Sequence, residues 1–150
     1  NCLSISAVMV NRKILEDTPF FNEDEKFITA EDYHLWLKLA KHNVRFGFLD
    51  QILGKCRIHE GNNSGFPIKN MMAVKSVFTD YYDKIKNPSL KIKILAWRRL
   101  AIIEYSGARG LQRNREHFRA LITFIKAIAR WPFIPKFYLA FLFNIFHLKL

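Results

Sequence analysis

The sequence predicts an α/β chain that is mostly helical, with a few short strands within residues 1–60 and a C-terminal helical extension. Short runs before residue 60 alternate apolar with polar or small side chains, which is typical of strands. Beyond Pro67, apolar residues recur every three or four positions, which is typical of helices. The length of 150 residues, half of them hydrophobic, suffices for about one domain with a buried core.

Three strands are expected in the first part of the chain. The first covers residues 3–10, where small and apolar side chains alternate. The second covers residues 44–50, and the third covers residues 51–59. Because side chains alternate with period two, Lys55, Arg57 and His59 would share one face of this last strand. A short helix or turn is expected at residues 11–18, and polar residues 60–65 form a loop.

The first long helix is expected within residues 28–42. Thr29 is a natural N-cap, and Asp32 stands three residues later, where the carboxylate of a capping box would sit. The core-facing stripe follows the helical spacing and is widened by two leucines; its members are Tyr33, Trp36, Leu37, Ala40, Leu35 and Leu39.

Residues 66–150 read as a series of helices. The first ends near Asn87, the next starts at Pro88 and stops at Gly107 as a C-cap, and a third covers residues 113–131. The third helix places an apolar set on one face and Arg and Lys on the other; the set is Phe118, Leu121, Ile122, Ile125, Ile128 and Ala129. The apolar tail over residues 135–150 is too short for a lone membrane span, which needs about 20 residues.

The charge is distributed unevenly along the chain. Residues 1–65 hold 8 Lys or Arg against 9 Asp or Glu, whereas residues 66–150 hold 16 against 4. The second part is therefore a basic amphipathic helical extension. It fits a surface of anionic lipid better than nucleic acid, for which no stacking platform or recognition helix is evident, and a plain helical core with a solvated basic face remains an alternative. Two cysteines without a metal-type spacing favour a reducing, cytoplasmic compartment.

Two groups of residues are candidate site residues. Glu31 and Asp32 stand in the first turn of the expected helix, where acids complement the helix dipole, or where one of them could serve as a general base. Arg57 and His59 could form the solvated face of an edge strand. Alternatively, they could bind phosphate, or His59 could ligate a metal.

The order of three segments resembles the C-terminal half of the catalytic domain of family 2 glycosyltransferases, which are inverting enzymes with the GT-A fold. These segments are SISAVMVNRKIL, then FFNED, then AEDYHLWLKLAKHNVRFGFLDQILGKCRIHEGNNS. The most specific part is Glu-Asp-Tyr-x-Leu-Trp-Leu followed by Arg-Ile-His and a Ser five residues later. The resemblance covers residues 1–65 and implies an acceptor-side half of a GT-A domain there.

The resemblance implies roles for particular residues. Asp32 would be the catalytic base that deprotonates the acceptor, and Glu31 would support it. Arg57 and His59 would bind the donor diphosphate, with His59 also near the metal. Asn63 and Ser64 would lie in the same loop, as acceptor or loop residues.

The family's nucleotide-binding half and its Asp-x-Asp motif are not in this sequence. We therefore expect a piece of a longer enzyme that uses a nucleotide-sugar donor, Mg²⁺ or Mn²⁺, and a saccharide or lipid-linked acceptor of surface polysaccharide biosynthesis. We also expect a cytoplasmic location, with peripheral contact of residues 66–150 to the inner face of the membrane. The alternative is a non-catalytic basic helical module that binds anionic membrane or nucleic acid.

Overall fold

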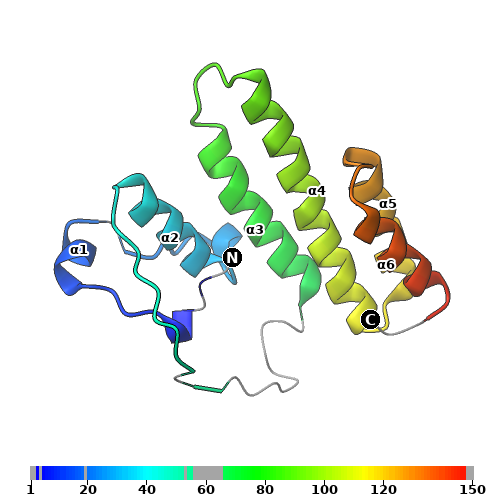
Figure 1. Cartoon of the computed structure of the whole chain (residues 1–150), viewed down its shortest axis with the longest axis horizontal. Helices are drawn as coiled ribbons and strands as arrows, with labels where there is room; N and C mark the ends of the chain where they lie inside the picture. The colour runs from blue at the N-terminus through cyan, green and yellow to red at the C-terminus, as the bar shows by residue number, and fades with distance from the viewer. Residues whose placement is uncertain (1–2, 4, 19, 53, 56–65, 148–150) are drawn as a thin grey trace.

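The computed structural model describes residues 3, 5–18, 20–52, 54–55 and 66–147, and its elements are helical (Figure 1). The N-terminal part contains two 3-10 helices and two α-helices: η1 Ile5–Ala7, α1 Arg12–Glu16, η2 Glu25–Phe27 and α2 Glu31–Lys41. The described C-terminal part contains four α-helices: α3 Pro67–Tyr82, α4 Leu90–Arg113, α5 His117–Arg130 and α6 Pro135–Ile145.

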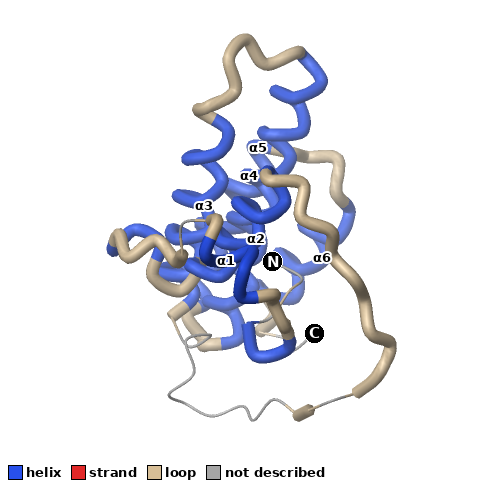
Figure 2. Tube along the Cα trace, turned by 90° about the vertical axis from the view of Figure 1, so that its left-hand side faces the viewer, coloured by secondary structure: helices blue, strands red, loops and turns tan. Residues whose placement is uncertain are grey.

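The prediction of an α/β fold is wrong for this chain. No strand occurs within the described residues, and Figure 2 shows helices joined by loops there. Residues 5–7 form a 3-10 helix, and residues 44–50 have no regular secondary structure. A strand needs a neighbouring strand to pair its backbone groups, and an alternating pattern does not supply that neighbour. Instead, Val8, Val10 and Val44 pack as side chains against α2.

Helix α2 is confirmed, but its start and its buried face differ from the prediction. Ala30, not Thr29, is the N-cap residue, and the N-cap residue contributes no side-chain hydrogen bond. His34, Leu35, Trp36 and Leu39 are buried, whereas Ala40 is exposed. The buried face is displaced because α2 is covered on two sides. The N-terminal segment packs against Leu35, Trp36 and Leu39, and α3 packs against Phe27 and Ala30, which precede the helix.

Helices α3 and α4 form an antiparallel hairpin in the middle of the molecule (Figure 1). Gly107 is not a C-cap, because α4 continues to Arg113. A Cβ on Gly107 would collide with the side chain of Met71, and a Cβ on Gly110 would lie 2.5 Å from Cβ of Pro67. These glycines therefore allow the two helices to approach closely.

Helices α4, α5 and α6 enclose two buried clusters, and Tyr105 packs against both. One consists of Ala108, Leu111, Ala120, Phe124 and Ala140, and the other of Ala101, Ala127 and Phe137. Between α4 and α5, Arg130 donates from Nε and Nη2 to the two carboxylate oxygens of Glu104 at 3.0 and 2.9 Å, and these hydrogen bonds raise the pKa of Arg130. Between α5 and α6, the amide of Asn144 donates to the carbonyl oxygen of His117 at 2.9 Å.

The third expected helix exists as α5, but most of its predicted apolar face does not face the core. Phe118, Ile122 and Ile125 are exposed, whereas Ala120, Thr123, Phe124 and Ala127 are buried. Among the described helices, none combines the length and the hydropathy needed to cross a membrane.

Candidate functional site

The two adjacent carboxylates stand in the first turn of α2, as the sequence indicates. Glu31 is the first residue of the helix and Asp32 the second, and both side chains are half-buried. Oδ1 of Asp32 accepts a hydrogen bond of 2.6 Å from the backbone N–H of Tyr33. Since the first N–H groups of a helix have no partner within it, this carboxylate satisfies one of them and is held in place.

The backbone immediately before these carboxylates is strained. Thr29 has a φ of 83°, in the left-handed region that β-branched residues rarely adopt. Its hydroxyl oxygen and Oε2 of Glu31 are both buried without a hydrogen-bond partner among the described residues. Strain and unsatisfied buried oxygens both cost free energy, and strained residues cluster at binding and catalytic sites.

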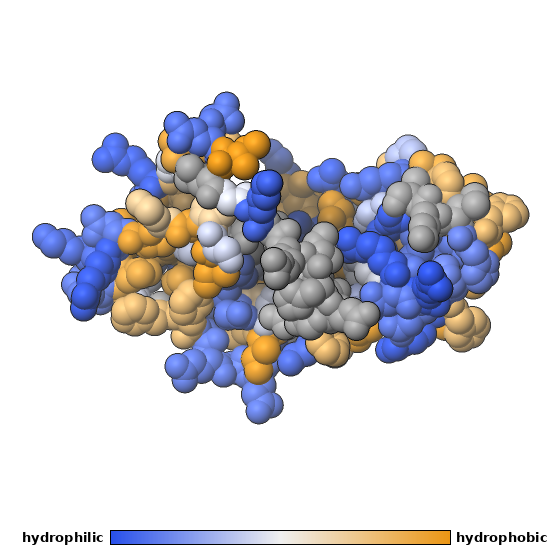
Figure 3. Space-filling model, turned by 90° about the horizontal axis from the view of Figure 1, so that it is seen from below, coloured by the Kyte–Doolittle hydropathy of each residue, from blue (hydrophilic) through white to orange (hydrophobic). Residues whose placement is uncertain are grey.

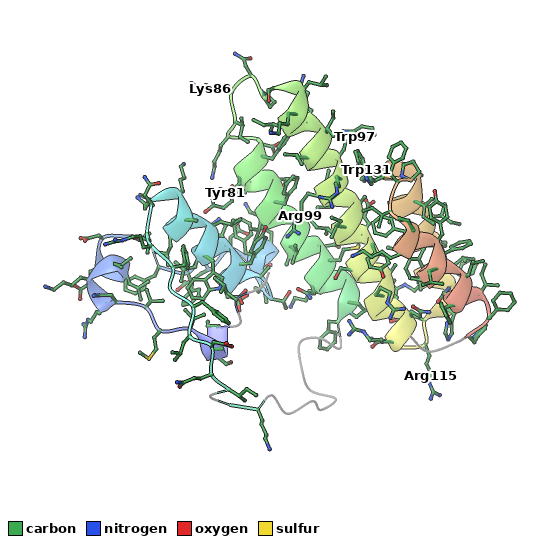
Figure 4. The ribbon with its side chains drawn as sticks, in the orientation of Figure 1. Tyr81, Lys86, Trp97, Arg99, Arg115 and Trp131 are labelled. Carbon is green, nitrogen blue, oxygen red and sulfur yellow. The ribbon has the colours of Figure 1, made fainter. Side chains whose placement is uncertain are left out.

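Tyr81 of α3 and Arg99 of α4 form hydrogen bonds to α2 (Figure 4). Arg99 of α4 donates to the hydroxyl of Tyr33 at 3.2 Å, and its guanidinium lies 5.8 Å from the centre of that ring. The hydroxyl of Tyr81 on α3 donates to the carbonyl oxygen of His34 at 3.3 Å. Burial, reinforced by the nearby Asp80 carboxylate, raises the pKa of Tyr81 to about 12, so this phenol stays protonated at neutral pH.

His34 is a buried imidazole at the interface of α2 and α3. Its ring stacks on Phe27 at 4.5 Å, and Nε2 lies 3.4 Å from Oδ2 of Asp80. Burial lowers the pKa of His34, which favours the neutral ring with its proton on Nε2. The pKa of Asp80 is lowered by hydrogen bonds from Lys84 and His34, which outweigh the opposing effect of its burial. These contacts join α2 to α3.

A groove of about 540 Å³ lies next to the segment that leads into α2. Ile28 lines it from that segment, and Phe66, Met72 and Lys69 line it from the start of α3. Lys26 and Arg119 add positive charge, with Glu25 and Glu116 beside them. Neither Glu31 nor Asp32 lines this groove, so the geometry does not join the carboxylates and the groove into one cavity.

The other predicted site residues lie outside the described residues. These are Arg57 and His59, expected at the diphosphate and the metal, and Asn63 and Ser64 of the expected loop. The third predicted strand lies partly outside as well. Within the described residues, no group of three or more His, Cys, Asp or Glu side chains could hold a metal ion. Trp36 is buried, and its indole N–H donates to the carbonyl oxygen of Leu3 at 3.3 Å, which confirms its role in packing.

Sequence reasoning missed several residues that shape this region. Arg99, Asp80 and Tyr81 reach α2 from helices more than 45 positions further along the chain. No local pattern marks such pairs. The strain at Thr29 is equally invisible, because Thr before two acids indicates an N-cap.

Comparison with protein-family models, curated proteins and solved structures found no match to the chain.

Proposed function

We propose that the chain is the acceptor-side part of an inverting glycosyltransferase, similar to those of family 2. The enzyme transfers a sugar from a nucleotide-sugar donor to a glycan or lipid-linked acceptor in surface polysaccharide biosynthesis, at the cytoplasmic side of the membrane. The proposal rests on the motif resemblance. The observation that supports it best is the start of α2, where strained Thr29 precedes a carboxylate oxygen of Glu31 that is buried without a partner among the described residues.

Asp32 is the base in this proposal. Its carboxylate accepts the proton of the acceptor hydroxyl while that oxygen forms a bond to the anomeric carbon of the donor. The bond from this carbon to the nucleotide diphosphate breaks, and the diphosphate takes the electron pair, so the configuration inverts. A base must be held within hydrogen-bond reach of the proton that it removes, and the bond from the Tyr33 N–H to Asp32 restricts the carboxylate in this way. Glu31 contacts the acceptor beside it.

Donor binding is assigned to residues outside the described part. Arg57 and His59 would contact the diphosphate, and the remaining contacts would come from a donor-binding half that this sequence does not include. By the same resemblance, the donor-binding half would hold the divalent metal, Mg²⁺ or Mn²⁺, with His59 near it.

The test uses a chain in which these 150 residues follow a donor-binding half in the same reading frame. We expect Asp32→Asn to lower kcat by about 10²-fold or more, which is the usual contribution of a general base, with little change in thermal stability. Glu31→Gln is the matched control one position away and should lower turnover less. The measurement is release of nucleotide from the donor in the presence of acceptor.

The opposite result would support a non-catalytic role for the carboxylates. If Asp32→Asn lowers the unfolding temperature and retains turnover, the carboxylate is a helix cap only. Sugar transfer by the 150-residue chain alone would also contradict the proposal, because the donor site would then be complete within it. The alternative function is a non-catalytic basic helical module that binds anionic membrane or nucleic acid, and the exposed apolar side of α5 favours the membrane.

A further inference from the structure

An apolar stripe lies on the solvent-exposed side of α5. Phe118 is 75% exposed, and Ile122 and Ile125 are also exposed. These residues stand four and three positions apart, so they form one stripe along the helix. The small side chains Ala120 and Ala127 face α4 instead. Phe124 is buried with them, so α5 has an apolar core face and, in addition, this exposed apolar stripe.

Helix α6 presents a similar stripe of Tyr138, Leu142 and Ile145, each more than 40% exposed. The two stripes meet at a groove of about 700 Å³, which Phe118 lines from α5 and Ile145 lines from α6. Together the six residues of the two stripes make one surface, here named the α5–α6 face. Phe133, in the turn between the helices, is 76% exposed and extends the apolar character to that turn.

Basic side chains border the α5–α6 face. Arg119 and Lys126 stand seven positions apart on the exposed side of α5, next to the apolar stripe, and Arg115 lies at the rim of the groove. In Figure 4, Arg115 projects away from the body of the molecule. Figure 3 shows hydrophilic and hydrophobic side chains side by side at the end of the molecule formed by α5 and α6. Arg119 is paired with Glu116, which is its neighbour at the start of the helix.

We propose that the α5–α6 face docks on the surface of a bilayer that contains anionic phospholipid. Phe118, Ile122, Ile125 and the α6 stripe enter the boundary between headgroups and acyl chains, while Arg115, Arg119 and Lys126 bind lipid phosphates. Helices that lie in a membrane surface have this pattern of an apolar side with a basic border, and anionic lipid attracts each nearby Lys or Arg. The proposal does not depend on the transferase activity.

Charge argues for lipid against the other occupants of such a face. A two-fold interface with a second copy would bring the Arg115, Arg119 and Lys126 side chains of both copies close together, and like charges repel. The phosphates of a nucleic acid would pair with these cations, but they offer no apolar surface to the six exposed apolar side chains of this face. An anionic bilayer matches both the charge and the apolar surface.

The test is co-sedimentation of the 150-residue chain with vesicles of phosphatidylcholine alone and with phosphatidylglycerol added. We expect binding to the anionic vesicles. Phe118→Gln/Ile122→Gln/Ile125→Gln should weaken that binding at least about tenfold, because three inserted side chains no longer leave water. The matched control is Met9→Gln/Phe48→Gln/Ile52→Gln, which removes side chains that are at least 90% exposed in the N-terminal part and should bind as wild type.

A second pair of variants tests the basic border. Arg115→Gln/Arg119→Gln/Lys126→Gln should lose at least about tenfold in binding to anionic vesicles. Arg12→Gln/Lys41→Gln/Arg45→Gln removes the same charge from exposed positions of the N-terminal part and should lose much less. Circular dichroism and thermal unfolding of every variant establish that it is folded.

Three results would overturn the proposal. The first is no binding of the wild-type chain to either vesicle. The second is equal binding by the triple variant at Phe118, Ile122 and Ile125 and its control. The third is a dimer that the same triple variant dissociates, without vesicle binding by the wild-type chain, which would assign the α5–α6 face to a second copy.

Discussion

The neutral imidazole of His34 connects α2 to α3, and its protonation state determines how its contribution to the stability of the fold depends on pH. In the folded chain its ring is buried against Phe27, and burial lowers its pKa below the ordinary value. The unfolded chain therefore takes up a proton at a higher pH than the folded chain does. The stabilisation is complete above the unfolded pKa of about 6.5 and is lost as pH falls through the lower folded pKa.

We therefore expect the free energy of unfolding to fall as pH is lowered from about 7, with His34 carrying part of the slope. In His34→Gln this part of the slope should disappear, because the substituted side chain does not titrate. The measurement is urea unfolding at a series of pH values. His42→Gln is the control, since His42 is exposed at the end of α2, and it should keep the slope. If the slope is unchanged in His34→Gln, His34 has the same pKa in the folded and the unfolded chain, which would contradict the prediction.

At the scale of elements, the contact between α3 and α4 depends on two glycines with different neighbours. A Cβ at Gly110 would meet Cβ of Pro67, which belongs to a rigid ring next to the backbone. A Cβ at Gly107 would meet the flexible side chain of Met71, which can move aside. Alanine is favoured over glycine in a helix by up to about 1 kcal/mol, while overpacking costs about 1–3 kcal/mol.

Gly110→Ala should thus destabilise the chain by about 1–2 kcal/mol, because Pro67 cannot move without shifting the start of α3. Gly107→Ala is the matched comparison and should change the free energy of unfolding less. Chemical denaturation of both variants checks the difference. If Gly107→Ala proved the more destabilising variant, α3 would accommodate an added Cβ more easily at Pro67 than at Met71.

The helices show which features of elements the sequence reveals. Helical periodicity located α2 to α5, but the predicted caps at Thr29 and Gly107 were wrong. Helix α4 extends six residues past Gly107, because a glycine that allows close packing has the same letter as a C-cap glycine. Periodicity also grouped Phe118, Ile122 and Ile125 on one face of α5. Periodicity does not show whether that face is buried, because burial depends on how α5 packs against α4 and α6. The strand predictions were wrong because a local pattern does not show whether a neighbouring strand is available for pairing.

The candidate site was predictable to a smaller extent. Motif spacing selected Glu31 and Asp32, and both stand in the first turn of α2. Their surroundings come from Tyr81 and Arg99, which only the tertiary structure brings to α2. The assignments of Arg57 and His59 stay predictions, because these residues lie outside the described part of the chain.

At the scale of the whole molecule, α2 and the α5–α6 face lie on opposite sides of the α3–α4 hairpin (Figure 1). Distant sites without shared partners behave additively, with deviations of about 0.3–0.5 kcal/mol. We therefore expect Asp32→Asn to bind anionic vesicles within about twofold of the wild-type chain. The triple variant at Phe118, Ile122 and Ile125 should in turn keep the turnover of the longer enzyme on a water-soluble acceptor. Co-sedimentation and nucleotide release measure the two quantities separately. Loss of vesicle binding in a folded Asp32→Asn chain would contradict this independence and would place the carboxylates of α2 in contact with the lipid-binding part.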